Sequence, residues 1–248
     1  MATDIVTTLQ LDKELSGRVI AVKEIINCDS SFIISCVLSH CIKNKSAVIL
    51  ISLHKSLSHY QNVGIKMNYS LQKNIDAGFI IFCDLGAEYA DKLMKNQDIP
   101  IVCLLSKVNE TIVKMQEKYE TVNIILDGIT HLFDMNYNLS EVNSFCNEII
   151  KNARHIKKSF LLFHCNVASD DDISNVMSNL LSHKSDILLE VENLPSGWSA
   201  DVSGHLAMKY IGRKFEDEHD LYSMDLKFSK YLFKLFDRGV KLMAPGTV

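Results

Sequence analysis

The stretch RVIAVKEIINCDSSFIISCVLSHCIKNKSAVILISL, residues 18–53, decides the fold class of this chain. Its first part, residues 18–26, is rich in β-branched residues and predicts a strand. A helix is expected from Ser30 or Ser31 to about Lys43, because apolar residues recur on one face. Residues 47–53 (AVILISL) form a continuous apolar run, which is typical of a strand covered on both faces. This strand–helix–strand order predicts an α/β fold with a parallel sheet.

The same alternation continues along the chain and then changes. Up to His183, strands and helices follow each other; beyond it, only short strands joined by turns are expected. Residues 99–105 fit either a strand or the approach to a helix. We therefore predict a three-layer α/β domain over residues 16–248, with a mostly parallel central sheet, C-terminal antiparallel strands and a loosely ordered segment at residues 1–15. The expected strands are 79–83, 122–126, 160–165, 187–190, 202–211, 222–228 and 231–236, and the expected helices 54–67, 88–96, 107–119, 140–157 (capped by Ser140) and 170–182.

The first strand-to-helix turn lacks a phosphate-binding loop. Residues 26–32 (INCDSSF) contain no glycine and no lysine, whereas such a loop needs glycines for close backbone approach and a Lys-Ser/Thr pair for charge and magnesium. Lys45-Ser46 and Lys55-Ser56 reproduce only the last two letters of that motif, without the glycine frame, and are interpreted as chance matches. An ordinary NTPase is excluded.

Composition indicates a globular protein without a global nucleic-acid-binding field. Apolar residues make up 47% and charged residues 23% of the 248, and the formal net charge is -4. No basic, apolar leader and no apolar run of about 18 residues is found, so a cytoplasmic protein is expected, with a nuclear location also open. The seven cysteines include no C-x-x-C pair and lie mostly in apolar runs, which favours buried, reduced thiols.

A few residues have the chemistry of catalytic or metal-binding groups. Asp127 closes an apolar strand, where P-loop enzymes hold magnesium, but without the loop a turn and capping role is favoured. His155 and His164 have no partner at metal-ligand spacing. The chain contains no H-E-x-x-H or G-x-S-x-G motif, so no metal site, cofactor or hydrolase is predicted.

The strongest basic cluster lies near the end of the expected 140–157 helix, and Lys43 and Lys45 form a weaker second patch. Either the cluster complements the dipole of its own helix, or it contacts phosphates. The first interpretation is favoured because no aromatic residues are interleaved. The cluster consists of Lys151, Arg154, His155, Lys157 and Lys158.

Three segments carry a more specific signal. They are SLSHYQNVGIKM (residues 56–67), LLSHKS (residues 180–185) followed by Gly197 and DVSGHL (residues 201–206), and the ending at residues 231–239. In this order they resemble the family of the sixth subunit of the Elongator complex, although Arg238 stands where that family has lysine. The resemblance extends from about residue 18 to 240, without convincing cover of residues 86–120.

The resemblance implies a RecA-like domain without ATPase motifs of its own. Such a subunit joins the fourth and fifth Elongator subunits in a hetero-hexameric ring with two copies of each. The ring docks on the larger catalytic subunits and binds tRNA, and the complex modifies the wobble uridine. Within the family this subunit supplies interfaces and not chemistry.

Candidate contact residues follow from the matched segments. Tyr60 and Gly64 share a helix face, which suggests close packing at an interface, and Gly204 is expected in a hairpin turn. Trp198 is either an interface anchor or a lid on the core. RNA contacts, if made, are expected at Lys107 or in the residue 151–158 cluster (Lys151, Arg154, Lys157 and Lys158). The candidate interface residues are Tyr60, Gly64, Trp198, Asp201 and Gly204.

Two functions of other classes remain open at this point. One is a nucleotide- or cofactor-dependent enzyme with an unusual phosphate site. The other is a RecA-like accessory protein of recombination or signalling.

Overall fold

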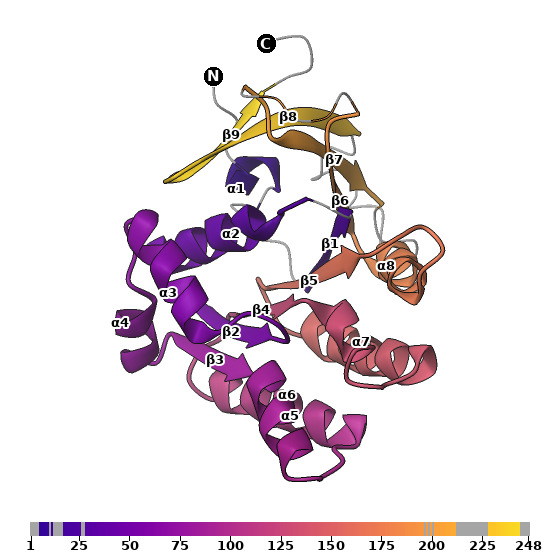
Figure 1. The fold of residues 1–248 in the computed structure, drawn as a ribbon. Coiled ribbons are helices and arrows are strands. Elements are labelled where there is room, and N and C mark those ends of the chain that lie inside the picture. Colours follow the sequence, from indigo (N-terminus) through magenta and orange to yellow (C-terminus); the bar gives the residue numbers. More distant parts are fainter. Residues whose placement is uncertain are drawn as a thin grey trace, which may run out of the picture.

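Helices and strands alternate along the chain in the computed structural model (Figure 1), which describes residues 5–9, 11, 17–25, 28–195, 197, 199, 201–211 and 228–243. The helices are α1 (Ile5–Thr8), α2 (Ser31–Lys43), α3 (Leu57–Lys66), α4 (Leu71–Asp76), α5 (Leu85–Met94), α6 (Ile101–Gln116), α7 (Leu139–Arg154) and α8 (Ile173–Lys184), with a 3-10 turn, η1 (Ile129–Leu132). The strands are β1 (Arg18–Ile25), β2 (Ala47–Ser52), β3 (Ile80–Asp84), β4 (Val122–Asp127), β5 (Phe160–Val167), β6 (Ile187–Glu192), β7 (Gly204–Tyr210), β8 (Ser229–Phe236) and β9 (Gly239–Met243).

These strands form one mixed sheet in the order β3-β2-β4-β5-β1-β6-β7-β8-β9. The pairings from β3 to β6 are parallel, and those from β6 to β9 are antiparallel. Residues of β2 and β4 are buried throughout, as their unbroken apolar runs predict. The predicted α/β fold with a parallel core and an antiparallel extension is confirmed, and the arrangement is consistent with a RecA-like domain.

Helices cover both faces of the parallel part of the sheet (Figure 1). One apolar core lies between the sheet and α1–α4, and the other between the sheet and α5–α8. Fully buried side chains such as Phe163 in one core and Leu38 in the other each contribute about 1.5–3 kcal/mol through burial. Because the strands are parallel, their carboxyl ends meet at one edge of the sheet and their amino ends at the opposite edge.

The structure corrects one sequence expectation, decides one that was open and adds two elements. The N-cap of α7 is Asn138 and not Ser140, because Asn138 and Glu141 complete a capping box. Residues 101–105 belong to helix α6, whose buried Leu104, Val108 and Ile112 lie one turn apart. Helix α4 and strand β9 were not expected.

The N-terminal segment contains a packed turn of helix where loose order was expected. Ile5 and Leu9 are 2% and 1% exposed and belong to the core beneath α2. The Leu9 carbonyl accepts a hydrogen bond of 2.7 Å from Arg18. The predicted strand at 222–228 lies outside the described residues apart from Phe228, which precedes β8. The assignment of residues 16–248 to a single domain stays a prediction.

The seven cysteines form no disulfide with one another, and four of them are buried, as the apolar runs around them predict. Burial raises the pKa of Cys41 and Cys165 to about 12, which keeps these thiols protonated and unreactive. Cys103 on α6 is exposed. Among the described residues, no helix is both long enough and apolar enough to cross a membrane.

Candidate functional site

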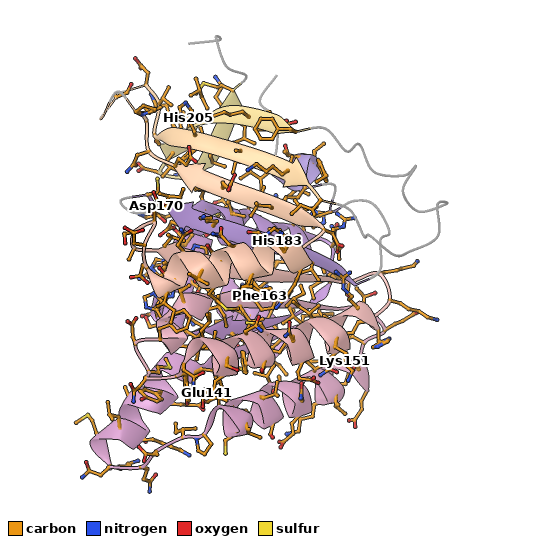
Figure 2. All side chains as sticks on the ribbon, turned by 90° about the vertical axis from the view of Figure 1, so that its right-hand side faces the viewer. Glu141, Lys151, Phe163, Asp170, His183 and His205 are labelled. Atoms are coloured by element: carbon orange, nitrogen blue, oxygen red, sulfur yellow. The ribbon has the colours of Figure 1, made fainter. Side chains whose placement is uncertain are left out.

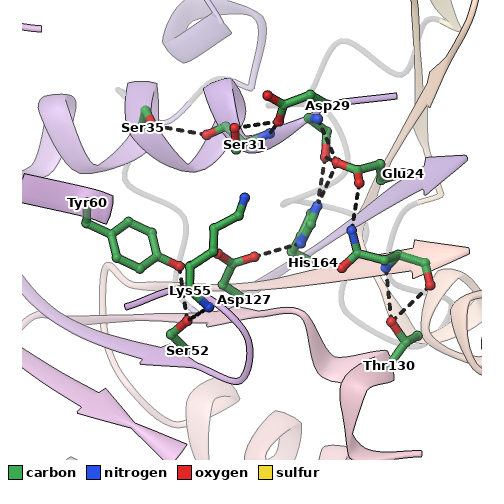
Figure 3. A network of polar contacts seen from close by, with 12 residues as sticks. Glu24, Asp29, Ser31, Ser35, Ser52, Lys55, Tyr60, Asp127, Thr130 and His164 are labelled. Atoms are coloured by element: carbon green, nitrogen blue, oxygen red, sulfur yellow. Dashed lines mark hydrogen bonds and ion pairs between the residues drawn. The ribbon is translucent and has the colours of Figure 1, made fainter. Parts of the chain in front are cut away.

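The carboxyl edge of the sheet is the usual ligand site of parallel α/β folds. In this chain the ends of β1, β2, β4 and β5 meet there beside the amino end of α2, the place where a phosphate-binding loop would lie (Figure 3). Residues 28–30 of the β1–α2 connection are described, and residues 26–27 lie outside the described part.

The amino end of α2 is already bonded to carboxylates of the chain itself. Glu24, near the end of β1, accepts hydrogen bonds from the Ser30 N–H at 2.6 Å and from the Ser30 hydroxyl at 2.7 Å. Asp29 accepts a bond from the Ser31 N–H at 2.9 Å and another from the Ser31 hydroxyl. Helix-start N–H groups of this kind hold the phosphates of bound nucleotides in P-loop and dinucleotide-binding folds. Here two carboxylates take their place.

His164 links this helix start to the end of β4. Its Nδ1 lies 2.7 Å from Asp127 Oδ1, and its Nε2 lies 3.4 Å from Glu24 Oε2. The side chains of His164 and Asp127 are both completely buried. The two charge partners come from different strands, so the imidazole ties β1, β4 and β5 together at this edge.

Buried electrostatics fix the charge of this cluster. Burial disfavours the imidazolium, but Asp127 and Glu24 outweigh it and raise the pKa of His164 to about 9. Burial likewise opposes ionisation of Glu24, yet His164 and the bonds from Ser30 lower the pKa of that carboxyl to about 2. The pKa of Asp127 is also lowered against the effect of burial, mainly by His164. At neutral pH the cluster therefore consists of one cation between two anions.

Tyr60 completes the cluster from α3. Its hydroxyl donates a short hydrogen bond to Asp127 Oδ2 and lies 3.3 Å from the Ser52 hydroxyl. Ser52, the last residue of β2, accepts a bond of 2.9 Å from the backbone N–H of Lys55. Burial and the charge of Asp127 raise the pKa of Tyr60 far above its usual value, so the phenol stays a donor. Four strand ends and two helices are thus joined by one polar network.

Ser30, His164 and Asp127 have the order of a nucleophile, base and acid, with Ser30 Oγ 2.7 Å from His164 Nε2. The arrangement cannot perform acyl transfer, for two physical reasons. An imidazole held as imidazolium cannot accept the serine proton, and Ser30 is 0% exposed and so out of reach of a substrate.

A hollow of about 430 Å³ lies beside the network. Its lining includes Glu24, Asp134 and Asp172, together with His131, which lies 2.8 Å from Asp134, and Asn166, which donates a bond of 2.6 Å to Glu24. Three carboxylates disfavour the phosphates of a nucleotide. Within the described part of the chain, no group of three or more His, Cys, Asp or Glu side chains is arranged to hold a metal ion.

Comparison with known proteins identifies the family of this chain. A family model described as "Elongation complex protein 6" matches residues 5–230. The chain belongs to this family.

Full-length relatives agree with the family match. "Elongator complex protein 6" of Drosophila melanogaster is 24% identical over 255 aligned positions, which cover 100% of this chain and 98% of the relative. The proteins of the same name from Rattus norvegicus and Homo sapiens are 23% and 24% identical, each over 88% of this chain and 87% of the relative. The resemblance inferred from residues 56–67 and 201–206 is confirmed.

Two of the interface candidates lie inside the fold. Tyr60 is 3% exposed, and a Cβ on Gly64 would lie 2.7 Å from the ring of Tyr69. The close approach expected at Gly64 therefore occurs within this chain. A partner contact by either residue stays a prediction.

The other interface candidates lie near β7 and β8. Gly204 is not in a hairpin turn, because it begins β7, where a Cβ would lie 2.6 Å from the Glu192 carbonyl of the neighbouring strand. Asp201 is largely exposed, 3.7 Å from the Lys234 amine. Trp198 lies outside the described residues.

The candidate RNA-contacting residues differ in their pairing and exposure. Lys107 is paired with Glu88, and Arg154 holds the buried Asp186 at 3.3 Å and the Lys184 carbonyl at 3.1 Å. Lys151 is 4.0 Å from Glu148 and largely exposed. Arg154 therefore stabilises the fold, whereas the two remaining candidates, Lys157 and Lys158, are exposed.

Sequence reasoning missed the central residue of the network, because His164 has no partner nearby in sequence. One signal was present. A histidine inside the apolar strand FLLFHC must be buried, and a buried polar ring needs a hydrogen-bonding or charged partner. Asp127, interpreted as a turn and cap residue, is that partner, and the left-handed turn is made by Gly128 with φ of 78°.

Proposed function

We propose that this chain is the non-catalytic, RecA-like subunit of the Elongator accessory ring. In this proposal it assembles with the fourth and fifth subunits into a hetero-hexamer that docks on the larger catalytic subunits. It thereby supports tRNA binding and wobble-uridine modification by the whole complex, in the cytoplasm and also the nucleus. Family membership over residues 5–230 supports the place in Elongator.

One observation carries the non-catalytic part of the proposal. The N–H groups of Ser30 and Ser31, at the helix start where a nucleotide phosphate would bind, are bonded to Glu24 and Asp29. A phosphate would have to displace two carboxylates, one of which also pairs with the buried His164. The missing glycine loop and the filled anion position point to the same role.

Co-expression with the fourth and fifth Elongator subunits tests the assembly. Native mass measurement should give a hetero-hexamer with two copies of each chain. A chain that stays monomeric in the presence of both partners would refute the proposal.

Variants of two interface candidates refine that experiment. Trp198→Ala and Asp201→Ala should weaken assembly if these residues lie at a partner interface. Asp170→Ala is the control for Asp201→Ala, because Asp170 is an exposed aspartate as well and lies in the turn before α8. Equal assembly by all three variants would remove Trp198 and Asp201 from the interface.

Nucleotide binding and the identity of co-purifying proteins distinguish the two alternative functions from the proposed one. An enzyme with an unusual phosphate site would be stabilised by nucleotide, and the carboxylate-lined hollow disfavours that outcome. A recombination or signalling accessory protein would co-purify with partners other than Elongator subunits, so affinity purification of the full chain distinguishes it.

A further inference from the structure

Two turns at the amino edge of the sheet have the same Lys-Ser sequence and the same backbone conformation at the lysine. Lys45-Ser46 precedes β2 and Lys158-Ser159 precedes β5. Both lysines are exposed, and both have left-handed backbone angles, with φ of 52° and 50°. Each turn follows the carboxyl end of a helix, α2 in one case and α7 in the other, and these helices lie on opposite faces of the sheet.

A single buried side chain holds the two turns side by side. Asn123, near the start of β4, donates a bond of 3.3 Å to the Ala47 carbonyl and accepts one of 3.1 Å from the Phe160 N–H. Asn123 is 4% exposed, and β4 lies between β2 and β5 in the sheet. Two strand spacings set the turns about 10 Å apart. Two lysine patches that are distant in sequence thus form one surface.

This surface, which we call the basic edge, consists of Lys43, Lys45, Lys157 and Lys158, all exposed. Within the described residues no ion pair joins Lys43, Lys45 or Lys157 to a carboxylate. Two exposed carboxylates, Glu117 and Glu120, lie in the turn before β4, the strand between β2 and β5.

The opposite, carboxyl edge of the sheet has the reverse charge. It carries acidic groups at its strand ends and helix starts. Figure 2 shows this polarity in the helical layer, with Glu141 and Asp170 at one end and Lys151 towards the other. Besides Glu24, Asp127 and Glu141, the acidic groups of the carboxyl edge include Asp29, Asp84, Asp134, Asp170, Asp171 and Asp172.

Helix dipoles alone do not account for the basic edge. A lysine in the last turn of a helix complements its own dipole, as Lys43 does at the end of α2. Lys45 and Lys157 lie beyond the ends of α2 and α7, however, and the dipole effect falls off within the last turn. The charge that gathers beyond the ends of the two helices therefore needs an explanation other than the helix dipoles.

We propose that the basic edge binds the sugar–phosphate backbone of RNA, an inference that rests on the proposed role in tRNA binding by the ring. Lysine presents a mobile point charge, which suits phosphate oxygens. Neither turn contains an exposed large hydrophobic side chain, so the surface lacks the apolar anchor on which a protein partner depends. The two lysine turns, residues 43–46 and 157–159, also contain no Phe, Tyr or Trp for base stacking, and contact is therefore independent of sequence.

The test compares two triple variants with equal net charge, each assayed as the full chain alone and in the assembled ring. Lys43→Glu, Lys45→Glu and Lys157→Glu alter the basic edge; Lys66→Glu, Lys92→Glu and Lys230→Glu alter exposed lysines elsewhere. With a fluorescent tRNA at about 100 mM salt, the first set should weaken binding about tenfold or more. The slope of the logarithm of the binding constant against the logarithm of the salt concentration should become less steep by about 0.9 for each phosphate contact that is lost. The control set should change affinity less than about twofold. Circular dichroism checks that both sets fold, and Lys→Gln changes at the same three edge positions should give the same direction of effect.

Three results would overturn the proposal. The first is an equal loss of affinity in both sets of variants. The second is no binding of tRNA by the wild type, either alone or in the assembled ring. The third is binding of polyglutamate as tightly as tRNA, which would indicate an acidic protein partner. Ring formation is scored separately by mass. Edge-dependent tRNA binding by a chain that fails to assemble would contradict the proposed function alone, whereas a normal ring with edge-independent binding would contradict this inference alone.

Discussion

The two edges of the central sheet use charge in opposite ways. At the carboxyl edge, Glu24, His164 and Asp127 are paired with each other inside the protein. At the amino edge, Lys45 and Lys157 are exposed in turns that precede two strands bridged by Asn123. Parallel α/β proteins usually bind ligands at the carboxyl edge. In this family member the helix start at that edge is bonded to carboxylates of the chain itself, and the exposed lysine turns lie at the other edge.

The largest effect should come from removing the cation of the closed edge. His164→Ala leaves Glu24 and Asp127 without their shared counter-ion. Loss of one partner of a buried ion pair costs about 3–5 kcal/mol, and urea unfolding should show a decrease of that size in the free energy of unfolding.

His183→Ala is the matched control, because His183 is exposed near the end of α8 and should change stability by less than about 0.5 kcal/mol. A decrease below about 1 kcal/mol for His164→Ala would mean that the network is not a buried ion cluster.

The pH dependence of stability sharpens the comparison further. The pKa of His164 rises from 6.5 to about 9 in the folded chain, so its contribution is complete below pH 6.5 and is lost as the pH rises through 9. The pKa of Glu24 falls from 4.5 to about 2, so its contribution is present above pH 4.5 and is lost as the pH falls through 2. The urea midpoint should therefore decrease between pH values of about 6.5 and 9.

The same titration of His164→Gln provides the control, because it keeps every other group that ionises in this range. Its midpoint should vary less with pH than that of the wild type. Parallel curves for the two proteins would show that His164 is not the group responsible.

A smaller effect is expected at the amino edge. Asn123→Ala removes the bond to the Ala47 carbonyl and leaves the buried Phe160 N–H without an acceptor. The expected cost is about 1–3 kcal/mol in urea unfolding. Asn62→Ala, on the exposed surface of α3, should have almost no effect, and equal costs for the two changes would argue against a bridging role for Asn123.

Much of the fold could be predicted from local pattern, because each element carries its own signal. Residues 18–53 show the alternation of buried strand and one-faced helix, and β1, α2 and β2 lie close to their expected positions. Ser140 was mistaken for the cap of α7 because the competing Asn138 pairs reciprocally with Glu141, a contact that single-residue preference does not reveal.

The two edges could not be predicted in the same way, because they depend on strand order. Glu24, Asp127 and His164 lie on three strands whose adjacency no spacing in the sequence reveals. Lys45 and Lys158 appeared as separate patches, and Lys45-Ser46 as a chance match to a nucleotide motif. Only the order β2-β4-β5 brings the two turns together.

The most direct test of the closed edge is nucleotide binding by the wild-type full chain alone. Thermal and urea unfolding are measured with increasing magnesium–ATP, with magnesium alone as the control. A site filled at 100 times its dissociation constant would add about 2.7 kcal/mol to stability. We predict no saturable change, because Glu24 and Asp29 already occupy the N–H groups at the start of α2. A saturable increase of that size would contradict the account.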